Sequence, residues 1–220
     1  NKERFYQRLG IQYYWYNKGY ENFSCFLDKL KTKKRKNIIK EREYLKKNNI
    51  NIIVKKGDEI RSEDINLFFK CYLNTINKKW SIAYLKHSFF DQILNSIIKK
   101  KIVLIQAFEK NIFVGCSLHF IGEKNFYGRY WGCLKEIPFL HFELCYYSAI
   151  DFAIKNNLKK VEAGAQGEHK IARGYEPKLT YSNHWFEHSK LSPLIKKFLI
   201  EEKKKVKDTI GYLNQFMPFK

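Results

Sequence analysis

The segment "KIVLIQAFEKNIFVGCSLHFIGEKNFYGRYWGC" (residues 101–133) decides the fold class. It is rich in β-branched and aromatic residues, and short turns break it near residues 110 and 123. It therefore predicts three strands, at 101–110, 111–122 and 125–133. Because the connections between them are short, we expect the strands to pair as an antiparallel meander. The regular alternation of strand and helix that marks a doubly wound sheet is missing.

Further elements lie on both sides of this meander. Strands are expected at "IQYYWYN" (11–17), "INIIVKKG" (50–57), "KKVEAG" (159–164) and "LTYSNHWFEH" (179–188). Helices are expected at about 32–48, 62–75, 83–99, 138–156 and 193–207. The sequence thus predicts an α/β fold with a mainly antiparallel central sheet flanked by helices.

Length and composition allow one domain over residues 1–220, because 45% of the residues are hydrophobic. Residues 1–57 would supply the entry strands and a basic helix, and residues 58–220 the sheet core and the candidate site. No apolar run is long enough for a transmembrane helix. The chain opens on Asn1 instead of Met, so we expect a fragment of a longer protein.

The five cysteines are widely spaced in apolar runs, without a CxxC motif or a Cys/His metal spacing. We expect free thiols in the reducing cytoplasm, and no metal site. The net charge of +20 favours a nucleic-acid partner, because Lys and Arg attract phosphates. AT-rich codon usage, which also raises Ile, Asn, Phe and Tyr, explains the charge equally well.

The basic helix at about 32–48 is not uniformly charged. Helical spacing places Arg35 and Arg42 beside the apolar face formed by Ile38, Ile39 and Leu45. Their partner can be a structural acid, a ligand phosphate or an RNA backbone. Lysines 33, 34 and 40 have the spacing of an ordinary solvated face.

The helix that follows Pro138 is apolar almost all round, so it should be buried. His141 shares a polar stripe with Ser148, while Glu143 is expected on the far side. Glu143 in the first turn is either a structural carboxylate, favoured by the helix dipole, or a buried acid that orients a substrate amine.

In "FYGRYWG" (126–132), strand alternation places Arg129 with Tyr127 and Trp131, and Tyr130 on the opposite face with two glycines. Arg129 either stacks on the aromatic rings as a structural cation or contacts a ligand. The glycines leave room for a ligand against the backbone, with Tyr130 beside it.

The segment "EAGAQGEHKIARGY" (162–175) concentrates polar chemistry between small residues. Gly164 and Gly167 allow a sharp turn after a strand, and a short helix from Glu168 to Arg173 should end at Gly174. The alternative is a tight turn whose charges pair with one another. Because ionisable groups beside glycines at the exit of a strand are typical of a site, we favour a site here. Its candidate residues are Glu162, Gln166, Glu168, His169, Lys170 and Arg173.

The motifs "YGRYWG", "PFLHFELCYYSAIDFAI", "VEAGAQGEHKIARGYEP" and "YSNHW" together resemble the FemAB-like (peptidoglycan biosynthesis/recognition) family of predicted N-acyltransferases, in the GNAT superfamily. "RKNIIKER" extends the resemblance into the N-terminal half. The resemblance implies a GNAT-like fold, and a chain that is the C-terminal part of a longer member.

The same region is more distantly similar to the C-terminal domain of the aminoacyl-tRNA-dependent Fem transferases. Lys170 and "RGY" (173–175) would match the basic and glycine positions of their motif, whereas Glu162 replaces an aspartate. The pyrophosphate loop of ordinary GNAT enzymes is missing from "CLKEIPFLHFE" (133–143), so no motif supports coenzyme A. The helix start can still hold an anion.

These observations predict an N-acyltransferase or aminoacyltransferase that forms an amide by direct attack of an amine on an activated acyl donor. Glu162, Glu168 or His169 would be the base, and Tyr130 with loop N–H groups would hold the oxyanion. Anions of donor or acceptor would bind residues drawn from three regions: Arg35, Arg42, Arg129, His141, Glu143, Gln166, Lys170 and Arg173.

No cofactor is expected to be bound permanently, and the donor would be acyl-CoA or aminoacyl-tRNA. The acceptor amine would belong to a cell-wall precursor. Two alternatives remain open: a GNAT-like module that recognises a cell-wall precursor or tRNA without turnover, and a general nucleic-acid binder. The sequence does not indicate an oligomeric state.

Overall fold

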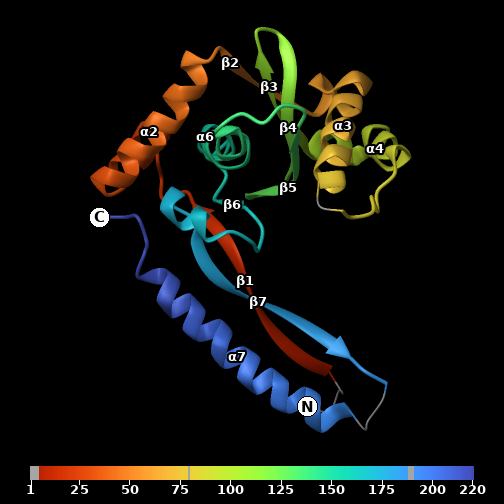
Figure 1. Ribbon diagram of the computed structural model, residues 1–220, viewed down its shortest axis with the longest axis vertical. Helices are drawn as coiled ribbons and strands as arrows, with labels where there is room; N and C mark the ends of the chain where they lie inside the picture. The colour runs from red at the N-terminus through yellow and green to blue at the C-terminus, as the bar shows by residue number, and fades with distance from the viewer. Residues whose placement is uncertain (1–4, 79, 188–190) are drawn as a thin grey trace.

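A mixed sheet forms the centre of the computed structural model, which describes residues 5–78, 80–187 and 191–220 (Figure 1). Within these residues the sheet has seven strands in the order β2-β3-β4-β5-β6-β1-β7. Their bounds are Phe5–Tyr16 (β1), Ile50–Lys56 (β2), Ile102–Glu109 (β3), Ile112–Ile121 (β4), Asn125–Cys133 (β5), Lys160–Glu162 (β6) and Glu176–Trp185 (β7). All neighbours pair antiparallel except β5 and β6, so the predicted mainly antiparallel sheet is confirmed.

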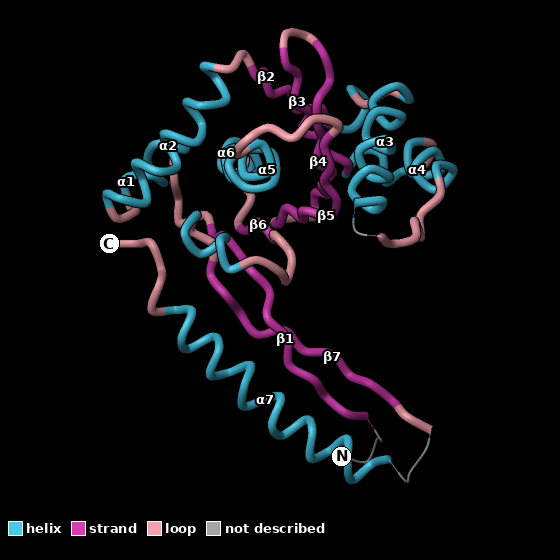
Figure 2. The backbone as a smooth tube through the Cα atoms, in the orientation of Figure 1, coloured by secondary structure: helices cyan, strands magenta, loops and turns pink. Residues whose placement is uncertain are grey.

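Helices cover both faces of the sheet (Figure 2). One face packs on α3 (Ser62–Lys78) and α4 (His87–Leu94). The other packs on α1 (Phe23–Asp28), α2 (Thr32–Lys47), α5 (Leu140–Phe142), a π-helical turn η3 (Glu143–Tyr147) and α6 (Ser148–Lys155). Three 3₁₀ segments complete the globular part: η1 (Gly57–Glu59), η2 (Ile97–Lys101) and η4 (Glu168–Arg173). The packing of α3 on β5 requires Gly132, because a Cβ there would lie 2.2 Å from the Cys71 carbonyl oxygen.

Strands β1 and β7 form a long two-stranded ribbon that projects from the rest of the sheet, with α7 (Ser192–Asn214) lying along it (Figure 1). Their pairing runs from Phe5 opposite Trp185 to Tyr14 opposite Glu176. No helix in the described part of the chain is both long and apolar enough to cross a membrane.

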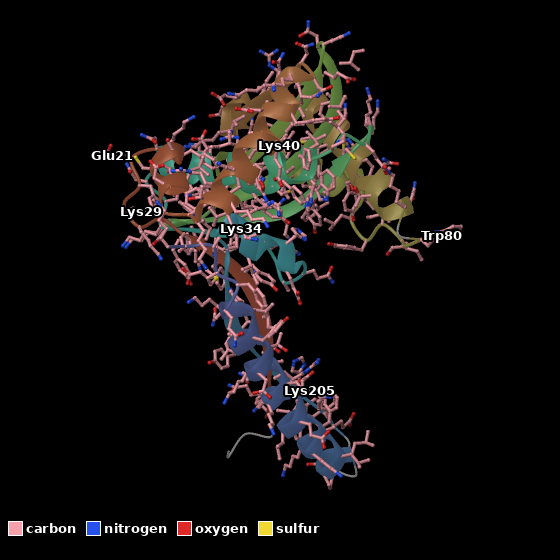
Figure 3. The ribbon with its side chains drawn as sticks, turned by 60° about the vertical axis from the view of Figure 1, so that its left-hand side comes forward. Glu21, Lys29, Lys34, Lys40, Trp80 and Lys205 are labelled. Carbon is pink, nitrogen blue, oxygen red and sulfur yellow. The ribbon has the colours of Figure 1, made fainter. Side chains whose placement is uncertain are left out.

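Most of the elements predicted from sequence are present. The meander is β3, β4 and β5, and the basic helix is α2, on which Lys40 is exposed and Lys34 half-buried (Figure 3). The helix predicted at 83–99 was wrong, since α4 ends at Leu94 and a separate 3₁₀ turn follows. The strand predicted to end at His188 ends at Trp185, and His188 lies outside the described residues.

A β-bulge corrects the predicted faces of β5. Leu118 of β4 pairs with Tyr130, and the next residue, His119, pairs with Gly128, so Arg129 is an extra residue on β5. Strict alternation therefore fails at this point. Gly128 lies toward His119 on the α6 side, whereas Tyr130 packs with the cluster beneath α3.

The π-helical turn corrects the predicted stripe on the buried helix. It shifts the helical phase, and Ser148 donates a hydrogen bond to the Glu143 carboxylate at 2.9 Å instead of lying opposite to it. Glu143 is buried and receives two further hydrogen bonds from Arg42, at 2.8 and 3.0 Å. The pair joins α2 to the start of the continuous helix formed by α5, η3 and α6, which we call the central helix.

This pair allows a matched test on one helix. Arg42→Ala should lower the free energy of unfolding by about 3 kcal/mol, because it leaves the buried Glu143 carboxylate without its cation. Arg35→Ala, which breaks an ion pair with the exposed Asp28, should cost less than about 1 kcal/mol. Urea unfolding of both variants measures the difference, and equal losses would contradict a structural role for Arg42.

Candidate active site

The sheet opens where β5 and β6 part. The two strands pair only from Asn125 opposite Lys160 to Tyr127 opposite Glu162. Beyond Tyr127, this edge of β5 has no strand neighbour among the described residues. Helix α3 satisfies two of its carbonyl groups, since Thr75 Oγ1 donates to Trp131 O at 3.1 Å and Asn74 Nδ2 donates to Cys133 O at 2.6 Å.

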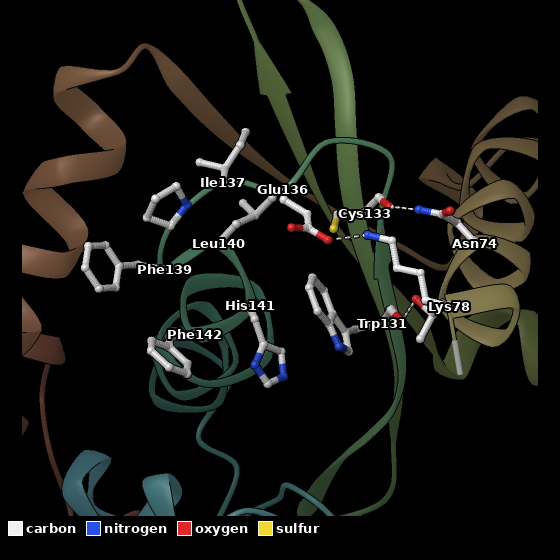
Figure 4. Close-up of a pocket in the computed structure, with 12 residues that line it drawn as sticks. Asn74, Lys78, Trp131, Cys133, Glu136, Ile137, Phe139, Leu140, His141 and Phe142 are labelled. Atoms are coloured by element: carbon white, nitrogen blue, oxygen red, sulfur yellow. Dashed lines mark hydrogen bonds and ion pairs between the residues drawn. The ribbon is translucent and has the colours of Figure 1, made fainter. Parts of the chain in front are cut away.

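A cavity of about 690 Å³ lies beside this open edge (Figure 4). Its walls come from β5, the C-terminal part of α3, and the loop and turn at 136–142. The lining is largely apolar and includes the rings of Trp131, Phe139 and Phe142, and an ion pair of 2.5 Å between Lys78 and Glu136 lies at its border. Such a mixture of apolar walls and few polar groups is typical of a ligand pocket.

His141 connects the cavity to the glycine-rich turn. Its ring packs against Trp131 with 4.5 Å between the centroids (Figure 4). It also lies 6.0 Å from the ring of His169. Phe142 also contacts His169, at 5.5 Å. The predicted site residues His141 and His169 are thus neighbours, although they are 28 positions apart in sequence.

The turn takes its shape from two glycines with positive φ, 83° at Gly164 and 96° at Gly167. A Cβ at Gly167 would lie only 2.4 Å from His169 Cε1, so a side chain there would displace the imidazole. His169 Nε2 is hydrogen-bonded to the Tyr146 hydroxyl at 3.0 Å. Partial burial, and then the charges of Arg173 and Lys170, lowers the pKa of His169, which keeps the ring neutral at pH near 7.

Lys170 lies beneath the turn, with only 4% of its surface exposed. Its ammonium donates hydrogen bonds to the carbonyl oxygens of Gly164, at 3.3 Å, and Gln166. No carboxylate within the described chain pairs with it. Because burial penalises its charge, the pKa of Lys170 falls to about 8.

Arg173 holds this segment against the rest of the protein. Its guanidinium donates to both oxygens of Glu41 on α2, at 2.9 and 3.0 Å, and to the Tyr147 hydroxyl at 2.8 Å. A fourth hydrogen bond reaches the His169 carbonyl oxygen at 2.9 Å, and the ring of Phe142 lies 3.5 Å away. With 8% exposure, Arg173 is mainly engaged in the structure itself.

The acidic candidates have different surroundings. Glu162 accepts from Lys160 at 2.8 Å and lies near the amide of Gln12. Glu168 is exposed and makes no ion pair with any residue that the structure describes. Gln166 is also exposed, and its backbone oxygen holds Lys170. A carboxylate free of partners is available to a substrate amine.

The other predicted site residues lie apart from this group. Tyr130 faces the α3 side, hydrogen-bonded to Tyr84 at 2.6 Å, and burial raises its pKa to about 12. Arg129 is exposed, 5.3 Å from the ring of Tyr130. Arg35 binds Asp28 at the surface. The pair of Arg42 and Glu143, described above, lies near a second cavity of about 460 Å³.

Sequence reasoning did not single out Asn74, Thr75 and Lys78, which α3 brings to the cavity. Their polar types near the end of an amphipathic helix are a weak signal. Among the described residues, no group of three or more His, Cys, Asp or Glu side chains could hold a metal ion.

Comparison with known proteins decides the family. The family model described as FemAB-like, peptidoglycan biosynthesis/recognition, matches residues 1–220. The chain belongs to the FemAB-like family. No curated protein sequence matches this FemAB-like chain.

Solved structures show the fold of this FemAB-like chain. L-PGS from Bacillus licheniformis superposes with a TM-score of 0.56 at 12% identity, over 90% of this chain and 66% of that one. FemX superposes with a TM-score of 0.57 at 11% identity, over 84% of this chain and 64% of FemX. The fold is GNAT-like, and the chain spans slightly less than two thirds of these two relatives.

The buried ammonium of Lys170 makes stability depend on pH. Between the folded pKa of about 8 and the ordinary value of 10.5, the unfolded chain binds more protons at this residue, so stability should rise with pH. From about pH 7 to about pH 9.5, the contribution of Lys170 is a gain of about 2 kcal/mol.

In Lys170→Met this gain in stability with pH should be lost, while all other ionisable groups titrate as they do in the wild type. Urea unfolding of both proteins at the two pH values measures the difference. If the two proteins showed the same change with pH, Lys170 would not be a buried, unpaired cation.

Proposed function

We propose that this domain transfers an acyl or aminoacyl group to an amine, at the cleft where β5 parts from β6. The observation that carries the proposal is the joining of three features. These features are an open strand edge, a cavity with aromatic walls, and a neutral, accessible imidazole. They are adjacent in space, because His141 contacts both Trp131 in the cavity and the imidazole of His169. Membership of the FemAB-like family supports transfer chemistry related to peptidoglycan.

The open edge offers donors for the acyl carbonyl. In an extended strand, the N–H and C=O of one residue point to the same side. The carbonyl groups of Trp131 and Cys133 point out of the open edge toward α3. The N–H groups of the same two residues therefore point out of the open edge as well. They would stabilise the oxyanion that forms on attack. They would take the role first expected of Tyr130, whose hydroxyl is engaged by Tyr84.

His169 is the best placed of the three predicted bases. Its neutral ring would take the proton that the amine loses as the new C–N bond forms, and the C–O or C–S bond to the leaving group then breaks. Glu168, exposed beside it, would attract the ammonium form of the acceptor. A covalent cysteine intermediate is disfavoured, because burial raises the pKa of Cys133, the thiol that lines the cavity.

The donor would be acyl-CoA or aminoacyl-tRNA, and the acceptor amine would belong to a cell-wall precursor in the cytoplasm. The GNAT-like fold is compatible with either donor, and likeness to FemX favours an aminoacyl donor. The cavity would hold the acyl or aminoacyl group between Trp131 and Phe142, with the larger part of the donor outside.

The first experiment is a thermal-stability screen of the protein with CoA thioesters, an aminoacyl-tRNA mimic and a UDP-linked muropeptide. A ligand that binds the folded state raises the melting temperature. The compound that does so becomes the donor or acceptor in a single-turnover assay of amide formation.

In that assay, His169→Gln should lower the rate about 100-fold, because it removes the base, and should change the dissociation constant of the donor less than about threefold. His184→Gln, on the projecting ribbon, is the matched control and should keep the wild-type rate. Equal rates for all three proteins would exclude His169 as the base. Stabilisation by a muropeptide with no amide formation would favour the alternative, a recognition module without turnover.

A further inference from the structure

The connection between α3 and α4 displays apolar side chains to solvent. The side chains of Trp80, Ile82 and Tyr84 are 98%, 90% and 67% exposed, respectively. We call these three residues the apolar tip. Figure 3 shows Trp80 pointing outward at the edge of the molecule, away from all other labelled residues. Soluble surfaces rarely gather large apolar groups this exposed without a partner.

The backbone of the connection is well anchored. Ala83 and Leu85 pack into the cluster beneath α3, while Trp80 and Ile82 are almost fully exposed and Tyr84 lies against Tyr72 and Tyr130 at the edge of that cluster. Leu85 N donates to the Tyr72 hydroxyl at 3.3 Å, and the Tyr84 hydroxyl meets that of Tyr130 at 2.6 Å. The tip is therefore held on a fixed support.

Trp80 adopts a φ of 51°, which bulky side chains rarely do. Its N–H donates to Asn77 O at 3.1 Å, whereas its ring is almost fully exposed. The exposed ring makes too few contacts within the described chain to offset the energetic cost of this backbone conformation. Strained backbone that presents a side chain outward is typical of binding segments.

The surroundings of the tip are cationic. The sequence has four lysines and neither Asp nor Glu between Asp64 and Asp91. Lys78 and Lys86, which precede and follow the tip, are exposed; Lys78 is ion-paired with Glu136, whereas Lys86 makes no ion pair with any residue that the structure describes. Tryptophan and tyrosine favour the interface between water and lipid, and lysines beside them attract anionic headgroups. A protein partner of this tip would need acids around an apolar pocket, whereas an anionic bilayer offers both features over any area.

From these observations we propose that the apolar tip inserts into the interface of an anionic lipid bilayer. Insertion buries the three side chains of the tip, and the unpaired Lys86 contacts lipid phosphate. Lys78 also lines the cavity beside β5, so docking would bring the mouth of that cavity close to the membrane surface. The proposal does not depend on the proposed transfer reaction.

The test is co-sedimentation of the whole chain with vesicles made of equal parts of phosphatidylcholine and phosphatidylglycerol. The protein should bind these vesicles, and bind vesicles of phosphatidylcholine alone much more weakly. Added salt should weaken binding, because it screens the lysines. The double variant W80S/I82S should lose roughly tenfold or more in affinity. Ile200→Ser removes an exposed apolar residue of α7 instead, and should bind as the wild type does.

Quenching of tryptophan fluorescence by brominated lipid locates the inserted residue. Trp80→Phe should lose most of the quenching, and Trp185→Phe, which removes the exposed tryptophan of the ribbon, should keep it. Unchanged vesicle binding by W80S/I82S would overturn the proposal. So would no binding of the wild type, or a self-association that only W80S/I82S abolishes, which would assign the tip to a second copy of the chain.

Discussion

The hydrogen bonds of the Arg173 guanidinium hold the candidate site together. They join three segments that are distant in sequence: Glu41 on α2, Tyr147 in the π-helical turn, and the backbone of His169 at the turn itself. Tyr147 also donates to Glu41, so the three polar groups form a closed network. A buried network of this kind stabilises only when every member is satisfied, and the loss of one leaves a charge without a partner. The position of the turn therefore depends on a residue that need not touch substrate.

The network matters for function because the turn that it holds lies beside the opening between β5 and β6. The turn at 163–167 begins where β6 ends, and it leaves the edge of β5 uncovered. On α5, directly before the π-helical turn, His141 contacts Trp131 and Phe142 contacts His169. Each of these features costs regular hydrogen bonding or favourable backbone geometry. Structures retain such irregularities mainly where ligands bind or reactions occur.

Much of the fold could be predicted from the sequence, because the hydrophobic pattern is local. The strands around Gly115, the basic helix and the turn at Gly164 follow from residue types and spacing alone. The β-bulge at Arg129 and the π-helical turn at Glu143 could not be predicted, since each inserts one residue into a regular period. The same two irregularities separate Tyr130 from the site and join Glu143 to Ser148. The partner of Arg42 could not be predicted from the sequence, because an arginine at this position suits an exposed ligand as well as a buried carboxylate.

The most direct test of the central claim is hydrogen exchange of the backbone in Glu41→Gln. Glu41 lies on α2 and contacts Arg173 and Tyr147. If the network holds the turn, loss of the Glu41 charge should speed exchange in residues 163–170 at least about threefold and leave β3 unchanged. Exchange in 163–170 at the wild-type rate would contradict the claim, because the turn would then keep its position without the network.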